Sequence, residues 1–224
     1  MASPSPAGRG GRTAVGARAC AAARHPVRAA RSTRAADLDP DQLTAREAAT
    51  GDLCVLLASS RPLDDGAAAF LARLRQEHGG HLVDPLHVTI DRIATPDEDA
   101  IRRAVKEIAS RIRPTRVRVG AIFGLRSKNR GSIVKLDVPR EPGLDRLIDA
   151  VKSALRAAGP PSLYGPERWA TVTALERVDR PASDAPRTLP APVQLFVGDT
   201  LLLSRIAGPA RYEILETASI PRTG

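Results

Sequence analysis

Cysteine is scarce in this chain, and its two cysteines lie in very different settings. Cys20 falls in an Arg- and Ala-rich stretch near the start, whereas Cys54 falls in an apolar run typical of a buried strand. Two cysteines placed in this way indicate neither a disulfide framework nor a cysteine-ligated metal site. Such sparse use is consistent with a reducing compartment, so we expect a cytoplasmic protein.

Long apolar runs are also missing. No stretch of the 224 residues is long and apolar enough to span a membrane, although 42% of the residues are hydrophobic. That content allows a substantial core, in one domain or in two small lobes. We therefore expect a soluble protein with no membrane partner, and we favour a monomer.

Acidic residues are absent from the first 36 positions, which makes the overall charge misleading. Seven of the 34 basic residues lie there, and the rest of the chain has 27 basic residues against 25 acidic ones. The net charge of +9 therefore belongs mostly to this stretch, and the remainder carries only +2. A nearly neutral body provides little of the electrostatic attraction that long RNA requires, which favours a short nucleotide or an RNA end.

Residues 1–48 are rich in Ala, Arg and Pro and contain little that a core could bury. This composition predicts a disordered tail, whose arginines could add nonspecific affinity for RNA. The stretch lacks the apolar centre of a secretion signal. An organellar transit peptide remains an alternative, as does a misassigned start codon.

Residues 49–220 show alternating strand and helix patterns. Strands are expected at 53–58, 87–93, 116–124, 132–138, 169–177, 193–204 and 210–218, and helices at about 67–78, 96–112 and 144–158. Strand, helix and motif strand recur once in each half. This order predicts an α+β fold with two pseudo-equivalent lobes, at about 49–124 and 131–220, with antiparallel sheet, outer helices and a shared central cleft.

Local signals predict where several of these elements begin and end. Gly79-Gly80 ends the first helix, and Thr95 is the expected N-cap of the second, with Glu98 completing a capping box. The polar stretch 126–131 is expected to join two strands as a hairpin loop. The Pro-rich stretch 181–192 is expected to be an irregular connector.

Two short motifs carry the chemical information. His87-Val88-Thr89-Ile90 lies in an expected strand, so the imidazole of His87 and the hydroxyl of Thr89 share one face while the apolar residues face a core. An imidazole can move a proton, and a hydroxyl can bind a phosphoryl oxygen. Thr171-Val172-Thr173-Ala174 repeats the pattern, with threonine in the position of a second histidine.

On these motifs and the order of elements, residues 50–220 resemble the two-histidine phosphoesterase superfamily, which includes 2′-5′ RNA ligases and cyclic nucleotide phosphodiesterases. The resemblance implies metal-independent acid/base chemistry on a nucleotide or RNA phosphodiester, without a cofactor. One histidine serves as general base and the other as general acid, because attacking and leaving oxygens lie on opposite sides of the phosphorus. It makes His87 the catalytic residue, with Thr89, Thr171 and Thr173 binding phosphate.

The second histidine of the family is missing, which makes the motif degenerate. The only histidines are His25, His78, His81 and His87. A threonine hydroxyl does not titrate near neutral pH, and loss of one acid or base costs about 10²- to 10⁴-fold in rate. Three interpretations follow. The protein is a weak or altered esterase, it uses another group, or it is a non-catalytic nucleotide- or RNA-binding protein. The candidates for another group are Tyr164, Glu167, Arg168 and Glu176.

A further alternative is a structural or interaction protein in which His87 is incidental.

Other residues of interest have simpler structural interpretations. His78 and His81 flank the helix end, where a partly exposed capping role is expected. The basic side chains of the loop are expected to be solvated: Arg126, Lys128 and Arg130. The single tryptophan, Trp169, is expected to pack against the core.

Overall fold

The computed structural model describes residues 49–93, 97–127, 131–158, 162–164, 170–208 and 211–222. The elements in chain order are β1 (Leu53–Ala58), α1 (Asp65–His78), β2 (His81–Leu82), β3 (His87–Ile93), α2 (Glu98–Ala109), β4 (Thr115–Ser127), β5 (Gly131–Asp137), α3 (Pro142–Ala157), β6 (Thr171–Glu176), β7 (Arg187–Gly198), β8 (Thr200–Gly208) and β9 (Arg211–Ser219). The tail expected at 1–48 lies outside the described residues.

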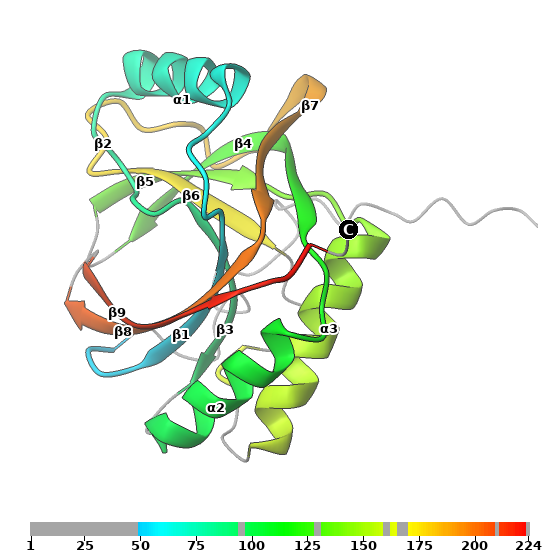
Figure 1. Ribbon diagram of the computed structural model, residues 1–224. Helices are drawn as coiled ribbons and strands as arrows, with labels where there is room; N and C mark the ends of the chain where they lie inside the picture. Colours follow the sequence, from blue (N-terminus) through cyan, green and yellow to red (C-terminus); the bar gives the residue numbers. More distant parts are fainter. Residues whose placement is uncertain are drawn as a thin grey trace, which may run out of the picture. The chain divides into compact units, whose positions relative to one another are not determined.

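The strands form one antiparallel sheet in the order β7-β4-β5-β6-β3-β1-β8-β9, with β2 paired to β6 (Figure 1). Three helices accompany the sheet within the described part of the chain, so the expected α+β class is confirmed. The sheet interleaves the two halves of the sequence, because β4 pairs with β5 and β7 while β8 and β9 extend the side of β1.

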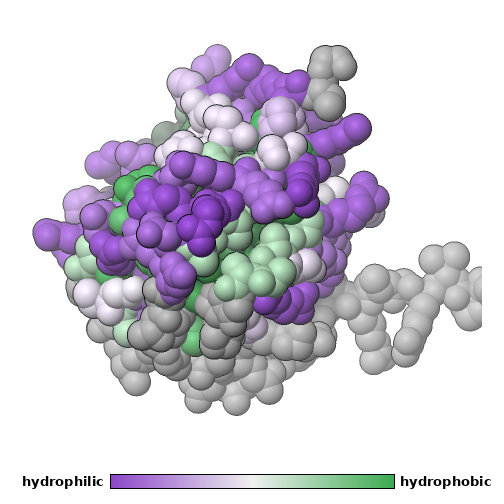
Figure 2. All heavy atoms as spheres, turned by 60° about the horizontal axis from the view of Figure 1, so that its bottom comes forward, coloured by the Kyte–Doolittle hydropathy of each residue, from purple (hydrophilic) through white to green (hydrophobic). Residues whose placement is uncertain are grey.

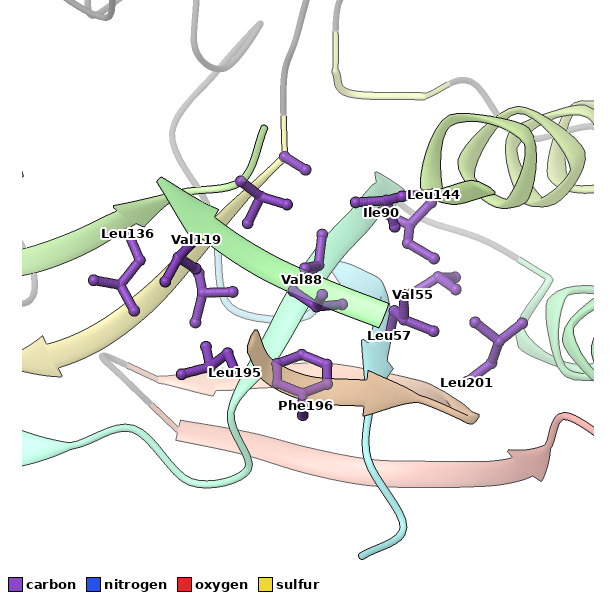
Figure 3. Close-up of a cluster of buried hydrophobic side chains, with 14 of the residues drawn as sticks. Val55, Leu57, Val88, Ile90, Val119, Leu136, Leu144, Leu195, Phe196 and Leu201 are labelled. Atoms are coloured by element: carbon purple, nitrogen blue, oxygen red, sulfur yellow. The ribbon is translucent and has the colours of Figure 1, made fainter. Parts of the chain in front are cut away.

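One face of the sheet builds the main core. Inward side chains of β1, β3, β4, β5, β7 and β8 pack with Leu144 of α3 (Figure 3). Alternation explains the pattern, since Val88 and Ile90 of β3 are 0% and 2% exposed and belong to this core. β1 is apolar throughout because its other face is also covered, by a smaller cluster that includes Cys54 and Leu56.

Helix boundaries follow their capping residues. Gly79 caps α1 as expected, and its neighbour Gly80 has φ +79° and lies against the backbone of β6. α2 begins at Glu98 because the carboxylate of Asp97 accepts the N–H of Ala100, which makes Asp97 the N-cap. The prediction of Thr95 as the N-cap was therefore wrong, and Thr95 itself lies outside the described residues.

α2 and α3 lie side by side, and α1 lies toward the other end of the sheet (Figure 1). The buried residues of α2 and α3 recur at helical spacing, for example Ile101 and Val105, so each helix turns one face to the core.

Hydrophilic side chains predominate on the face shown in Figure 2. No helix in the described ranges combines the length and the apolar composition needed to cross a bilayer.

The C-terminal strands differ from the prediction. The expected strand 193–204 is two strands, because the chain turns at Asp199 and passes from β4 to the side of β1. The expected connector 181–192 is partly strand, since β7 begins at Arg187. β7 tolerates Pro190 and Pro192 because it is an edge strand whose pairing with β4 is irregular at that point.

Candidate active site

The two motif strands, β3 and β6, are neighbours in the middle of the sheet. Val88 pairs directly with Val172, and both side chains are completely buried in the main core. The residues on either side of this pair must point the opposite way. His87, Thr89, Thr171 and Thr173 therefore lie together on one face, which we term the site face.

Strand β5 adds two residues to the site face. Lys135 pairs with Thr173, and Asp137 pairs with Thr171. When the β3–β6 register is continued from Val88 and Val172, His87 lies beside Thr173 and Thr89 beside Thr171. Two rows result across three strands. The first row is His87, Thr173, Lys135, and the second row is Thr89, Thr171, Asp137.

Apolar side chains flank both rows. On β1, Ala58 pairs with His87 and Leu56 with Thr89. On β4, Phe123 pairs with Lys135 and Ala121 with Asp137, and these two β4 residues are 5% and 8% exposed. The polar and titratable groups are thus confined to three central strands between apolar margins.

The hydrogen bonding of His87 defines its tautomer. The side chain is 5% exposed, and its Nδ1 lies 2.7 Å from the carbonyl oxygen of Pro85. Because a carbonyl only accepts hydrogen bonds, Nδ1 is the donor, and the neutral ring carries its lone pair on Nε2. The ring of Tyr212 on β9 meets the imidazole edge to face, with centroids 5.5 Å apart and planes at 78°. Both contacts fix the ring, so Nε2 is the basic nitrogen of this imidazole.

Lys135 and Asp137 bring charge to the rows. The Nζ of Lys135 donates a hydrogen bond to Oγ1 of Thr171 over 3.4 Å. Burial raises the pKa of Asp137 above the usual range of an aspartate, because removal from water disfavours the charged form. Sequence spacing gave no signal for either residue, since each reaches the site face through the pairing of β5 with β6.

An arginine extends the site face along β3. A register shift opposite Val55 and Leu56 pairs Arg92 with Cys54, so Arg92 follows Thr89 on the same side of the sheet. Arg92 is 3% exposed, and its Nε lies 3.7 Å from the carboxylate of Asp52. Its guanidinium lies 5.3 Å from the ring centroid of Tyr164. These contacts hold Arg92 at the margin of the site.

The other residues considered from sequence are scattered. Glu176 pairs with Ile133 and His81 at the far end of β6, and Tyr164 lies against Arg92. His78 is 7% exposed and its Nδ1 donates to the carbonyl of Arg180, so the expected partly exposed cap was wrong. Arg126 is exposed at the end of β4. Lys128, Arg130, Glu167, Arg168 and Trp169 lie outside the described residues. Across the part of the chain that is described, no three His, Cys, Asp or Glu side chains are grouped so as to hold a metal.

Comparisons with known proteins identify the fold. No family model matches the chain, and no curated protein matches its sequence. Solved structures do match: one described as a phosphoesterase has 17% identity and a TM-score of 0.52, covering 77% of this chain and 99% of that one. TT0787 of Thermus thermophilus has 18% identity and a TM-score of 0.51, covering 77% of this chain and 100% of that one.

A third match is E. coli LigT complexed with 3′-AMP, with 23% identity and a TM-score of 0.50, covering 78% of this chain and 100% of LigT. At these identities the similarity concerns the fold. The chain therefore has the fold of the two-histidine phosphoesterases, as its sequence predicted.

Proposed function

We propose that the protein is a phosphoesterase that hydrolyses a nucleotide or RNA-end phosphodiester, with 2′,3′-cyclic phosphates as the substrate class. One observation carries the proposal: a histidine with its lone pair on Nε2 shares one face of two adjacent strands with three threonine hydroxyls. Acid/base chemistry without a metal or cofactor follows from these residue types.

Each residue has a role in this reaction. His87 accepts a proton from the attacking water at Nε2 while Nδ1 donates to Pro85, so the developing imidazolium keeps its orientation. Thr89, Thr171 and Thr173 donate hydrogen bonds to the phosphoryl oxygens and position the phosphorus for in-line attack.

The choice of a nucleotide substrate has two supports. LigT, which shares the fold, was crystallised with 3′-AMP, a nucleoside monophosphate. The body of the chain beyond its Arg-rich start has a net charge of only +2, which suits a short ligand better than a long polyanion.

The test is hydrolysis of 2′,3′-cyclic AMP by the full-length protein, with the product identified by chromatography. Replacing His87→Ala should lower kcat/KM by about 10²- to 10⁴-fold, because the general base is lost. His81→Ala is the matched control, since His81 is exposed on β2, and it should leave the rate unchanged. Absence of turnover in the wild type, or an unchanged rate in His87→Ala, contradicts the proposal.

Thr171 in the second histidine position favours a rival function, a nucleotide- or RNA-binding protein without turnover. A binding protein of this kind would take up 3′-AMP saturably, retain binding after His87→Ala, and form no product from the cyclic nucleotide. The same assay and an isothermal titration with 3′-AMP therefore separate the two functions.

A further inference from the structure

The proposed hydrolysis needs a second proton-transfer group. Water attacks on one side of the phosphorus while the ribose oxygen leaves on the other, and an alkoxide leaves poorly unless it is protonated. His87 serves the attacking side. Thr171 stands where the fold would otherwise provide a second imidazole, and no histidine follows residue 87. The site face offers another residue that can donate this proton.

Lys135 occupies the required place. Its strand lies on the far side of β6 from β3, so Lys135 and His87 end the same row with Thr173 between them. Two inter-strand spacings separate the two backbones, about 10 Å. A phosphoryl group placed over the middle of the row would need a hydrogen bond of about 3 Å to a side chain on either side. His87 and Lys135 therefore lie on opposite sides of a phosphorus placed over the middle of the row.

Lys135 contacts Thr171, the residue at the second histidine position. Nζ of Lys135 lies 3.4 Å from Oγ1 of Thr171, the hydroxyl that stands at the second histidine position. The ammonium group of Lys135, on the neighbouring strand, therefore lies beside the second histidine position. A phosphate bound to the threonine hydroxyls would meet this cation at short range.

We propose that Lys135 is the general acid of the reaction and takes the place of the second histidine. This inference rests on the proposed phosphoesterase function. In the step, Nε2 of His87 takes a proton from water as the new P–O bond forms. The P–O bond to the ribose 2′-oxygen breaks, and the Lys135 ammonium transfers a proton to that oxygen. The products are a 3′-phosphomonoester, an imidazolium and a neutral amine, and proton exchange with solvent restores both groups.

Asp137, the other titratable group in the rows, fits this role less well. It lies in the second row with Thr89 and Thr171, not in the row of His87. An ionised carboxylate there would repel a phosphate, although burial raises the pKa of Asp137 and so favours its neutral form. The ammonium group of Lys135 both attracts the phosphate and carries the proton that the leaving oxygen needs.

The experiment compares wild type, Lys135→Met, Lys135→Arg and the control Lys106→Met in the full-length protein. Lys106, on α2, pairs with Glu216 and is 58% exposed, so its replacement removes one lysine away from the site. The substrates are 2′,3′-cyclic AMP and thymidine 3′-(p-nitrophenyl phosphate), whose nitrophenolate leaves without a proton. Thermal unfolding confirms that each variant is folded.

On cyclic AMP, both Lys135 variants should lose about 10²-fold in kcat, because methionine has no proton and arginine does not release its own. On the nitrophenyl ester the loss should be at least tenfold smaller. Equal losses on both substrates, or restored cyclic AMP hydrolysis in Lys135→Arg, would show a purely electrostatic role and overturn the inference.

An unchanged rate in Lys135→Met overturns the inference but leaves the phosphoesterase function standing. Absence of cyclic AMP hydrolysis in the wild type overturns both the phosphoesterase function and the role of Lys135. Greater loss in Asp137→Asn than in Lys135→Met would assign the proton donor to Asp137 and overturn the role of Lys135.

Discussion

Thr171 stands at the position where the resemblance to the two-histidine phosphoesterases implies a second histidine. An imidazole titrates near neutral pH and transfers protons in both directions, which neither a threonine hydroxyl nor a lysine ammonium does. We therefore predict that Thr171→His raises kcat for 2′,3′-cyclic AMP by about tenfold or more. The measurement is steady-state hydrolysis at neutral pH.

Thr171→Gln is the matched control for this substitution, because glutamine is similar in size to histidine but has no titrating ring. It should lower activity, since it removes the Thr171 hydroxyl from the phosphate site and disturbs the contact with Lys135. A folded Thr171→His variant without a gain in rate would count against a phosphate bound between β3 and β6.

Single residues of the site were predictable from sequence only within one strand. The period of two placed His87 with Thr89, and Thr171 with Thr173, on common faces. Lys135 and Asp137 could not be found in this way, because the pairing of β5 with β6 decides which β5 residues join them. That register includes a shift between Val134 and Lys135, which no sequence spacing reveals.

At the scale of elements, the junction of β7 and β8 is where the sequence pattern misled most. The apolar run continues through it, so one strand was expected. Asp199 interrupts the run because its carboxylate accepts hydrogen bonds from the backbone N–H and the hydroxyl of Ser60 and from Arg222. Gly198 is required beside it, since a Cβ there would lie 2.6 Å from the side chain of Leu57. These contacts are long-range and leave no periodic signal.

The junction provides a prediction about stability. Asp199→Asn should lower the free energy of unfolding by about 1–3 kcal/mol, because an amide cannot satisfy all the donors that now meet a buried carboxylate. Asp184→Asn is the control, since Asp184 is exposed and accepts a local N–H from Ala185. Urea unfolding checks both variants, and equal midpoints for the two would contradict the assigned role of Asp199.

At the scale of the whole molecule, charged groups on α2, β8 and β9 connect elements far apart in sequence. Glu98 pairs with Arg102 and Arg205, and Glu216 with Arg102 and Lys106. The hydrogen bond from Arg102 lowers the pKa of Glu98, and the hydrogen bond from Lys106 lowers the pKa of Glu216. Both lie below the ordinary glutamate value of 4.5.

Because both pKa values are lowered in the folded state, the protein loses stability at acidic pH. Below about pH 4.5 the unfolded chain binds protons at these glutamates before the folded protein does. The stability they contribute is therefore present above that pH and is lost as the pH falls through the lower folded pKa values. Burial raises the pKa of Asp199, yet hydrogen bonds from Ser60, Arg222 and Thr200 outweigh it and lower the net value, so Asp199 acts in the same direction.

Asp137 opposes this trend, because burial raises its pKa and the folded state then binds its proton first. We predict a net loss of stability between roughly pH 5 and pH 3, measured by urea unfolding across the range. Glu216→Gln should make the decline shallower, whereas the exposed control Glu107→Gln should leave its slope unchanged. A decline that is equally steep in Glu216→Gln would contradict the role given to this network.

The central claim is that His87 faces a phosphate-binding surface with the lone pair on Nε2, and ¹⁵N NMR of histidine-labelled full-length protein tests it most directly. Signals are assigned with His87→Gln. Without ligand, neutral His87 should carry its proton on Nδ1, because that atom donates to Pro85. Saturation with 3′-AMP should shift the Nε2 signal of His87 and leave those of His78 and His81 in place. A proton on Nε2 in the ligand-free protein, or an unmoved His87 signal in the presence of saturating 3′-AMP, would contradict the claim.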